Sequence, residues 1–236
     1  MIISIIKIIL IFIISVLSGI AALITIPFNK NGKVFHYLAR LYAKGILLVS
    51  GVKVRTVGVE NLQSGKSYIY VSNHASGFDI PAVIAGIPDQ IRIVYKKELG
   101  KIPIWGWALK YNRTYIPIDR SSGADAIKSL DEAAEKMKSG ASVLLFAEGT
   151  RTKDGKLQPF KRGAFNLAVK SGVPVIPLTI NGSFKILPKK KFRILPGQIT
   201  LVLGKPIDVK IDGGKQEEIR LMDEVYKVIS NNYIEQ

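Results

Sequence analysis

Cysteine is missing from this sequence of 236 residues, and histidine occurs only twice, as His36 and His74. Without cysteine the chain can form no disulfide bond, no thiolate metal site and no cysteine nucleophile. The composition fits a reducing compartment without establishing one. One histidine beside one aspartate, His74 and Asp79, makes a poor metal site, so we expect no bound metal.

Acidic residues are also scarce, because 18 Asp and Glu stand against 34 Lys and Arg, a formal net charge of +16. Such a surface attracts anions, whether nucleic acid, acidic lipid headgroups, phosphorylated substrates or an acidic protein. No RNA-recognition or helix-turn-helix signature accompanies the charge, so nucleic acid is not an expected partner. The length suits one sizeable domain with its own core.

Charge is rare at the beginning of the chain, where Lys7 is the one charged side chain before Lys30. Residues 8–26 would form about 28 Å of helix, close to the thickness of the hydrocarbon core of a bilayer. A cleaved signal peptide would have a charged start and a shorter apolar region. A helix that is apolar on every face is either a membrane span or the core of a large protein, and a buried core helix is the less expected of the two in this chain. The pattern therefore favours a retained membrane anchor.

Residues 33–51 predict a second helix, amphipathic with cationic edges, which suits a headgroup layer. Six basic and no acidic residues lie between Lys30 and Arg55, and this bias predicts that the following domain lies in the cytoplasm. The first helix either spans the bilayer or forms with the second a hairpin that enters one leaflet. The marginal length of the first helix favours the hairpin. His36 is interpreted as an interfacial residue without a catalytic role.

From residue 51 onward, strand-like and helix-like segments alternate, and several strand candidates are nearly all apolar, as in strands covered on both faces. The predicted strands are residues 52–59, 68–73, 91–96, 114–118, 142–147, 173–180 and 198–204. The clearest helical patterns are residues 79–86, 123–140 and 215–233. The predicted fold is a layered α/β domain with a largely parallel or mixed sheet over 51–236, preceded by a membrane-anchoring hairpin over 1–50.

The stretch VSNHASGFDI places His74 at the end of a predicted strand and Asp79 at the start of the helix that follows. One bend in the loop brings the carboxylate to the imidazole, where it would fix the tautomer and leave the other ring nitrogen free to accept a proton. Asp79 also resembles a helix N-cap, and His74 could be a hydrogen-bonded loop residue. Ser76 lies between them, but no G-x-S-x-G elbow marks it as a nucleophile.

A second candidate lies in LLFAEGTRTKDG, residues 144–155, where a buried strand ends in Glu148. Gly149 permits a tight turn and a close approach of the backbone to a ligand. Arg151 can grip a phosphate or a carboxylate with its planar guanidinium. Glu148 needs a partner if it is buried, either a cation or a substrate hydroxyl. An ordinary charged turn with an ion pair is the alternative.

Two further segments are rich in basic residues. Residues 95–120 fit a phosphate cradle near a bilayer, or a solvated basic face around a helix whose Trp105 and Trp107 pack or lie at the interface. Residues 184–197 carry a run of lysines flanked by Phe and Leu, which could contact anionic lipid, recruit an acidic acyl carrier or form a solvated loop. Contact with the membrane fits the rest of the chain best.

NHASGFD and FAEGTR, in this order and at this separation, resemble the N-H-x4-D and F-x-E-G-T-R motifs of the glycerolipid acyltransferase family. YIPIDR at 115–120 and VPVIPLTI at 173–180 resemble two further blocks, so four blocks fall in order. KKELGKIPIWGW resembles the branch of the family that acylates lysophosphatidic acid. The positions that match the two main motifs are Asn73, His74, Asp79, Phe146, Glu148, Gly149, Thr150 and Arg151.

In that family a His–Asp pair works without an acyl-enzyme. The resemblance implies that His74 deprotonates the glycerol hydroxyl of a lysophospholipid and that Asp79 orients His74. It also places Arg151 and Lys97 on the acceptor phosphate, and Glu148 beside the acceptor hydroxyls. Further predicted substrate-binding residues are Arg120, Asn73, Gly149 and Thr150.

The resemblance implies 1-acyl-glycerol-3-phosphate as the acceptor, acyl-CoA or an acyl carrier protein as the donor, phosphatidic acid as the product, and no cofactor. The protein is then expected at the cytoplasmic face of the bacterial inner membrane, in contact with anionic lipids. Glycerol-3-phosphate, another lysophospholipid or a lyso-aminolipid stay open as acceptors. A non-catalytic lipid-binding module would account for the charge, but not for the two motifs occurring together.

Overall fold

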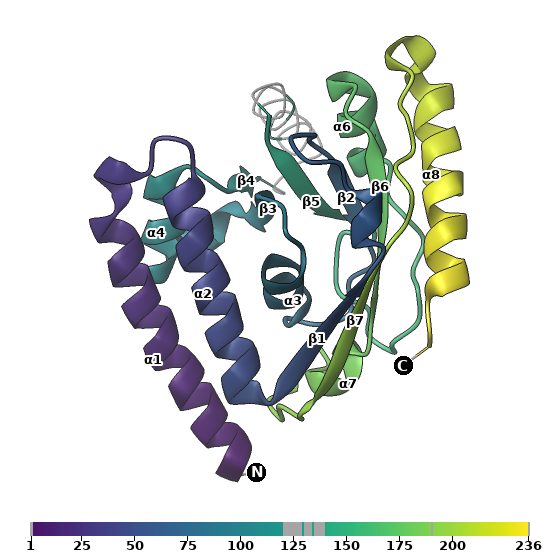
Figure 1. Cartoon of the computed structure of the whole chain (residues 1–236). Helices are drawn as coiled ribbons and strands as arrows, with labels where there is room; N and C mark the ends of the chain where they lie inside the picture. The colour runs from purple at the N-terminus through teal and green to yellow at the C-terminus, as the bar shows by residue number, and fades with distance from the viewer. Residues whose placement is uncertain (1, 120–128, 130–133, 135–139, 190, 236) are drawn as a thin grey trace.

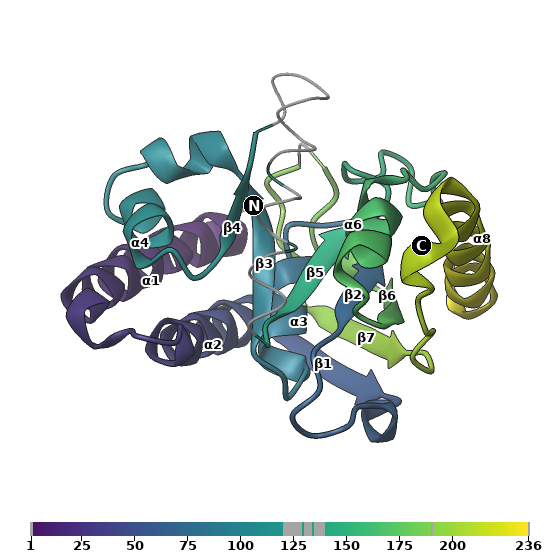
Figure 2. The ribbon, with the colours of Figure 1, turned by 90° about the horizontal axis from the view of Figure 1, so that it is seen from above.

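A mixed sheet forms the centre of the molecule (Figures 1 and 2), in a computed structural model that describes residues 2–119, 129, 134, 140–189 and 191–235. Within these residues the sheet has seven strands in the order β1-β7-β6-β2-β5-β3-β4. Neighbouring strands are parallel except β6 and β7, which are antiparallel. The strands are β1 (Val52–Val57), β2 (Ile69–Ser72), β3 (Ile91–Lys96), β4 (Ile116–Ile118), β5 (Ser142–Phe146), β6 (Val175–Asn181) and β7 (Gly197–Leu203).

Helices cover both faces of this sheet, which confirms the predicted layered α/β class. The helices are α1 (Ile2–Ile24), α2 (Lys33–Ser50), α3 (Asp79–Gly86), α4 (Trp105–Asn112), α6 (Gly163–Ser171), α7 (Ser183–Ile186) and α8 (Gly214–Asn232). β2 shows the pattern of a strand covered on both sides, because Ile69 and Val71 enter the core beneath α6 and α8, whereas Tyr70 enters the core beneath α2 and α3. All seven strands lie where the sequence predicts them. Most of the helix predicted over 123–140 lies outside the described residues.

α1 and α2 form a hairpin along one side of the molecule (Figure 1), and α1 also packs against α4. The two helices are joined by a hydrogen bond of 2.9 Å between Ser15 Oγ and Tyr42 OH. Near the end of α1, Asn112 Nδ2 donates to the carbonyl of Ala22 at 3.0 Å. Near its beginning, the N–H of Ile194 donates to Ser4 Oγ at 3.3 Å. α1 is therefore hydrogen-bonded to residues of the sheet domain near both of its ends.

α1 begins at Ile2, before the uncharged segment over residues 8–26, and therefore includes Lys7. The ammonium of Lys7 does not interrupt the apolar face. It turns toward the protein, where it donates to the carbonyl of Ser50 at 2.8 Å and to the carbonyl of Ile194 at 3.4 Å. Ser50 is the last residue of α2, so the positive charge lies at the negative end of that helix dipole.

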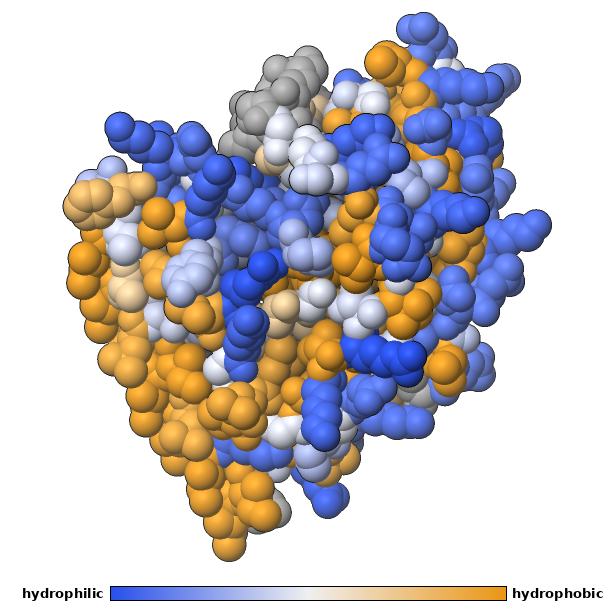
Figure 3. Space-filling model, viewed as in Figure 1, coloured by the Kyte–Doolittle hydropathy of each residue, from blue (hydrophilic) through white to orange (hydrophobic). Residues whose placement is uncertain are grey.

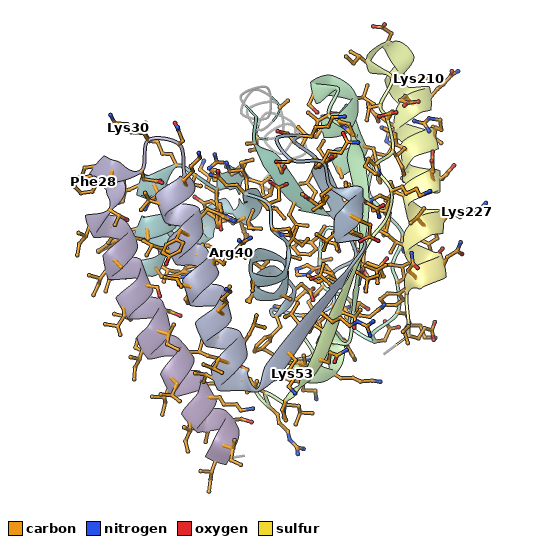
Figure 4. The ribbon with its side chains drawn as sticks, viewed as in Figure 1. Phe28, Lys30, Arg40, Lys53, Lys210 and Lys227 are labelled. Atoms are coloured by element: carbon orange, nitrogen blue, oxygen red, sulfur yellow. The ribbon has the colours of Figure 1, made fainter. Side chains whose placement is uncertain are left out.

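His36 is not interfacial, in contrast to the sequence interpretation, because only 7% of the residue is exposed. Burial, together with the charge of Arg40, lowers the pKa of His36 to about 4, so the ring is neutral at physiological pH. Arg40 also faces inward and points from α2 toward α3 (Figure 4). Its Nε donates to the carbonyl of Ile84 at 3.1 Å, at the end of α3. The basic residues of α2 therefore divide between the solvent and the protein interior.

The hairpin and the sheet share one hydrophobic core, in which Ala22 of α1 and Phe35 and Ile46 of α2 belong to the same cluster as Tyr70. Among the described residues, α1 is the one helix that has the length and apolar composition needed to cross a membrane. The predicted boundary after residue 50 coincides with the end of α2, and the division into two domains stays a prediction.

Gly19 and Gly45 both lie in the hairpin, and they differ in the space that a larger side chain would find. A Cβ atom on Gly19 would lie 2.9 Å from Ile104 Cγ2 and 3.2 Å from the backbone of Trp105, whereas one on Gly45 would lie 3.6 Å from Ile14. Alanine favours a helix interior over glycine by about 1 kcal/mol, but overpacking costs about 1–3 kcal/mol. We expect Gly45→Ala to raise the midpoint of thermal unfolding in detergent, and Gly19→Ala to lower it. Equal midpoints for the two variants would contradict this packing.

Candidate active site

The candidate residues gather at one edge of the sheet. His74 follows β2 by two residues, Glu148 follows β5 by two residues, and Lys97 comes directly after β3. β2, β5 and β3 are neighbours in the sheet and run parallel to one another. Because the carboxyl ends of parallel strands meet at the same edge, the two sequence motifs lie beside each other.

A short hydrogen bond joins the two residues of the first motif. His74 Nδ1 lies 2.7 Å from Asp79 Oδ2, and the same oxygen accepts the N–H groups of Ala75 at 2.8 Å and Ser76 at 2.9 Å. Asp79 is fully buried and is the first residue of α3, where the positive end of the helix dipole favours a carboxylate. When the carboxylate accepts a hydrogen bond from Nδ1–H, the lone pair of the imidazole lies on Nε2.

The His74 ring is oriented by a second contact. It stacks on the ring of Phe146, the last residue of β5, with 3.8 Å between the ring centroids and 15° between the planes. The His74 side chain is 17% exposed, so it is not sealed inside the protein. The face of an aromatic ring attracts a cation, and an imidazolium formed on His74 would therefore be stabilised both by Phe146 and by Asp79.

Glu148 holds the two motif loops together. The residue is only 3% exposed, and its Oε1 accepts the backbone N–H of His74 at 2.8 Å. Burial is the main cause that raises the pKa of Glu148 to about 7; the N–H of His74 opposes this shift, and the charge of Asp79 adds to it. The N–H of Thr152 also donates to the His74 carbonyl at 2.9 Å. The partner of Glu148 is thus a main-chain group. The contact of Glu148 with acceptor hydroxyls stays a prediction.

The rest of the second motif faces the first motif and is surrounded by basic side chains. Arg151 reaches the loop between His74 and Asp79, because a Cβ atom on Gly77 would lie 3.6 Å from Arg151 Nη1. Gly149 has a φ of 73°, which favours glycine, and a Cβ atom there would lie 3.2 Å from the ammonium of Lys161.

A further lysine contacts this turn from the loop between α7 and β7. Lys189 Nζ donates to Thr150 Oγ1 at 2.9 Å and to the carbonyl of Arg151 at 3.1 Å. The turn of the second motif thus has cations from three different segments of the chain around it.

Three other predicted residues have different surroundings. Lys97 is exposed and forms an ion pair of 3.1 Å with Asp119, and Arg120 lies outside the described residues. Asn73 is buried, and both ends of its amide bond the backbone of Ile180: Nδ2 donates to the carbonyl at 3.0 Å, and Oδ1 accepts the N–H at 2.8 Å. The structure therefore shows Asn73 joining the end of β2 to β6, which the sequence does not predict.

This arrangement is suited to removing a proton from an alcohol, because a carboxylate that accepts the Nδ1–H of His74 leaves Nε2 as the atom that can take the proton. Ser76 is fully buried, and its hydroxyl donates to the carbonyl of Leu187 at 2.9 Å, so its proton is engaged in the protein. In the described part of the chain, no group of three or more His, Asp and Glu side chains could hold a metal ion.

Comparison with known proteins gives the family. The acyltransferase family model matches residues 53–181, which contain both motifs. The chain belongs to the acyltransferase family. It is 38% identical over 177 residues to a chloroplastic 1-acyl-sn-glycerol-3-phosphate acyltransferase of Brassica napus, which covers 74% of this chain and 51% of that protein. It is 34% identical to the enzyme of the same name from Pseudomonas aeruginosa, over 70% of this chain and 63% of that protein.

A solved structure resembles almost the whole of this chain. The crystal structure of the 1-acyl-sn-glycerophosphate acyltransferase PlsC from Thermotoga maritima matches with a TM-score of 0.81 and 27% identity, over 98% of this chain and 93% of that one. The chain spans about half the length of the first curated relatives it matches.

Two residues of the site escape the sequence analysis. Phe146 is part of a motif, but nothing in the spacing indicates that its ring lies against His74. Lys189 belongs to a run of basic residues, and the sequence does not indicate which of them reaches the site. The path of the loop brings the Lys189 ammonium to Thr150. Both contacts depend on elements that are distant in sequence, and that is why local patterns do not contain them.

The pKa of Glu148 predicts a pH dependence of stability. Its folded pKa of about 7 exceeds the ordinary value of 4.5, so the stabilisation by the neutral carboxyl is complete below pH 4.5 and is lost as the pH rises through about 7. We expect Glu148→Gln, which keeps an acceptor for the His74 N–H, to reduce this loss by up to about 3 kcal/mol. Thermal unfolding in detergent from pH 4 to 9 measures it, with the exposed Glu60→Gln as the charge control. Parallel stability curves for wild type and Glu148→Gln would refute the assignment.

Proposed function

We propose that this chain is a membrane-bound acyltransferase that moves a fatty acyl group from an acyl thioester to the free sn-2 hydroxyl of 1-acyl-glycerol-3-phosphate, giving phosphatidic acid. The observation that carries the proposal is the His74–Asp79 pair, held at 2.7 Å at the open edge of the sheet. The names of the relatives support this acceptor.

The pair supports direct transfer. The acceptor hydroxyl gives its proton to His74 Nε2 while its oxygen attacks the thioester carbonyl carbon. Asp79 and Phe146 stabilise the imidazolium that forms. When the tetrahedral intermediate collapses, the carbon–sulfur bond breaks, and His74 returns the proton to the thiolate that leaves. The product is an ester and a free thiol, and no side chain carries the acyl group.

The acceptor phosphate has basic partners at the same edge. Arg151 is next to the loop of the catalytic pair, and its planar guanidinium can bind two phosphate oxygens at once. Lys97 lies at the end of β3, where its ammonium is exposed and is shared with Asp119. We assign both to the acceptor phosphate, with Arg151 the closer of the two to His74 in the sheet order.

We propose that a small apolar cavity receives part of an acyl chain. It lies between α1, α2, α3 and α4, and it is lined by Gly19, Leu38, Tyr42, Ile80 and Trp105 among others. Ile80 follows Asp79 directly in α3, so one wall of the cavity belongs to the helix that carries the catalytic carboxylate. A chain placed there would leave its ester or thioester end near the sheet edge.

The hairpin attaches the enzyme to one leaflet. Large apolar side chains gather over α1 (Figure 3), and Phe28 and Lys30 lie at the turn between α1 and α2 (Figure 4). Both ends of α1 contact polar parts of the sheet domain, near Ile194 at the beginning and near Asn112 at the end. A helix that crossed the bilayer would carry one of these ends to the far side, so we propose that α1 lies in a single leaflet.

The sheet domain would then face the cytoplasm, an orientation that the bias of basic residues supports, and it would touch anionic lipids. The donor is acyl-CoA or an acyl carrier protein, and we propose no cofactor beyond this co-substrate. An acceptor panel with glycerol-3-phosphate, other lysophospholipids and lyso-aminolipids distinguishes the proposed acceptor from its alternatives.

Alanine variants of the two histidines test the mechanism, with His36 as the control for His74. We expect His74→Ala to lower the turnover of lysophosphatidic acid by about 10²–10⁴-fold, because a positioned general base contributes this much. His36→Ala removes the buried ring of α2 and should keep the rate per folded molecule. The assay follows thiol release in detergent with both donor types, after thermal unfolding has shown which protein is folded. Full activity of His74→Ala would remove it as the base, and a wild type that consumes no thioester would favour a lipid-binding module.

Membrane attachment is tested on the exposed side of α1. Phe12 and Leu17 are more than half exposed there, and each contributes about 1.5–3 kcal/mol if lipid covers it. We expect Phe12→Ser with Leu17→Ser to reduce sedimentation with phosphatidylglycerol vesicles by tenfold or more. Ile219→Ser, an exposed site on α8 at the opposite side of the molecule (Figure 1), is the control. Unchanged sedimentation of the double variant would contradict the proposed attachment.

A further inference from the structure

The loop between α7 and β7 contributes a basic side chain that neither motif contains. Lys189 Nζ donates to Thr150 Oγ1 at 2.9 Å and to the carbonyl of Arg151 at 3.1 Å. Lys189 follows the second motif by 38 residues in the chain, so the fold and not the motif brings it to the site. An ammonium has three hydrogens to donate, and these two bonds occupy two of them.

The same loop is also bound to the first motif. The carbonyl of Leu187, two residues before Lys189, accepts the hydroxyl of Ser76 at 2.9 Å. Ser76 lies between His74 and Asp79 and donates its own N–H to the Asp79 carboxylate at 2.9 Å. Lys189 is therefore held between the two motif loops, within the edge that carries the catalytic pair.

The charge of Lys189 is available to a ligand. Both of its acceptors are neutral oxygens, and no ion pair of Lys189 or Arg151 with an acidic side chain occurs within the described residues. The nearest carboxyls of the site, Asp79 and Glu148, are buried and are bonded to main-chain N–H groups. An anion that binds at this turn would therefore meet two cationic side chains whose charges no carboxylate of the described residues neutralises.

We propose that Lys189 is a binding residue for the phosphate of the acceptor and acts together with Arg151. This inference rests on the proposed function, because it assigns a residue to the same substrate. A phosphate monoester carries nearly two negative charges and three acceptor oxygens near neutral pH, which one guanidinium does not satisfy. The third hydrogen of the Lys189 ammonium binds an oxygen that Arg151 leaves open, while Thr150 and the Arg151 carbonyl keep the ammonium in place.

Steady-state kinetics in detergent tests the assignment with Lys189→Met, Lys189→Arg and, as a control, Lys205→Met, an exposed lysine after β7. We expect Lys189→Met to raise the KM for lysophosphatidic acid by about 10- to 100-fold, the range of one lost charge-assisted hydrogen bond. Its kcat and its KM for the thioester should change by less than about threefold. Lys189→Arg should recover part of the loss, and Lys205→Met should match wild type.

Monoacylglycerol lacks the phosphate, so it distinguishes phosphate binding by Lys189 from a structural role of this residue. Wild type and Lys189→Met should use it equally poorly if Lys189 acts on the phosphate. An unchanged KM for lysophosphatidic acid would overturn the inference. So would an equal loss with both acceptors, which indicates a structural role, or a rise confined to the KM for acyl-CoA, which places Lys189 on the phosphates of the donor.

The inference and the proposed function fail in different experiments. A wild type that transfers no acyl group to lysophosphatidic acid ends the proposed function before any variant is compared. Calorimetric titration of lysophosphatidic acid into detergent-solubilised protein then decides the inference without turnover. The inference is supported if Lys189→Met weakens binding about tenfold or more and Lys205→Met leaves it unaffected. Equal binding by both variants overturns the inference.

Discussion

One carboxylate oxygen organises the site. Asp79 Oδ2 accepts the ring N–H of His74 and the backbone N–H groups of Ala75 and Ser76. A buried carboxylate without such donors would be strongly destabilised. Three donors on one atom compensate for that burial, and they also require the loop to curl around the carboxylate. The direction of the imidazole and the path of the loop are therefore set by the same interaction, so a substitution at Asp79 would disturb both.

The second motif supports the first through main-chain contacts. Glu148 accepts the N–H of His74, and Thr152 donates to its carbonyl, so the backbone of His74 is held from both sides by the turn after β5. Phe146, in the same segment, covers the face of the ring. Both motifs are needed, because neither loop forms the site alone. Their separation along the chain arises because α3, β3, α4 and β4 lie between β2 and β5 in the sequence, although β2 and β5 are neighbours in the sheet.

Sequence patterns predicted the sheet well and the surroundings of polar residues poorly. The strands were predictable because segments such as residues 69–72 are apolar and covered on both faces, a pattern that depends on local composition. His36 and Lys7 show the limit. Each lies in a helix whose apolar and basic residues suggest lipid or headgroups, yet His36 is buried and Lys7 binds the end of α2. Which way a polar side chain turns depends on helices packed beside it, and that is a property of the tertiary structure.

The cavity beneath the hairpin has a practical consequence. Its walls come from both sides, with Gly19 and Ala22 from α1 and Leu38 and Tyr42 from α2 facing Trp105 of α4. Removing the first thirty residues to obtain a water-soluble fragment would strip away one wall and uncover the apolar residues behind it. Such a fragment would tend to self-associate through the newly exposed surface. Keeping the hairpin preserves these walls, and detergent is then needed to cover the exposed apolar face of α1.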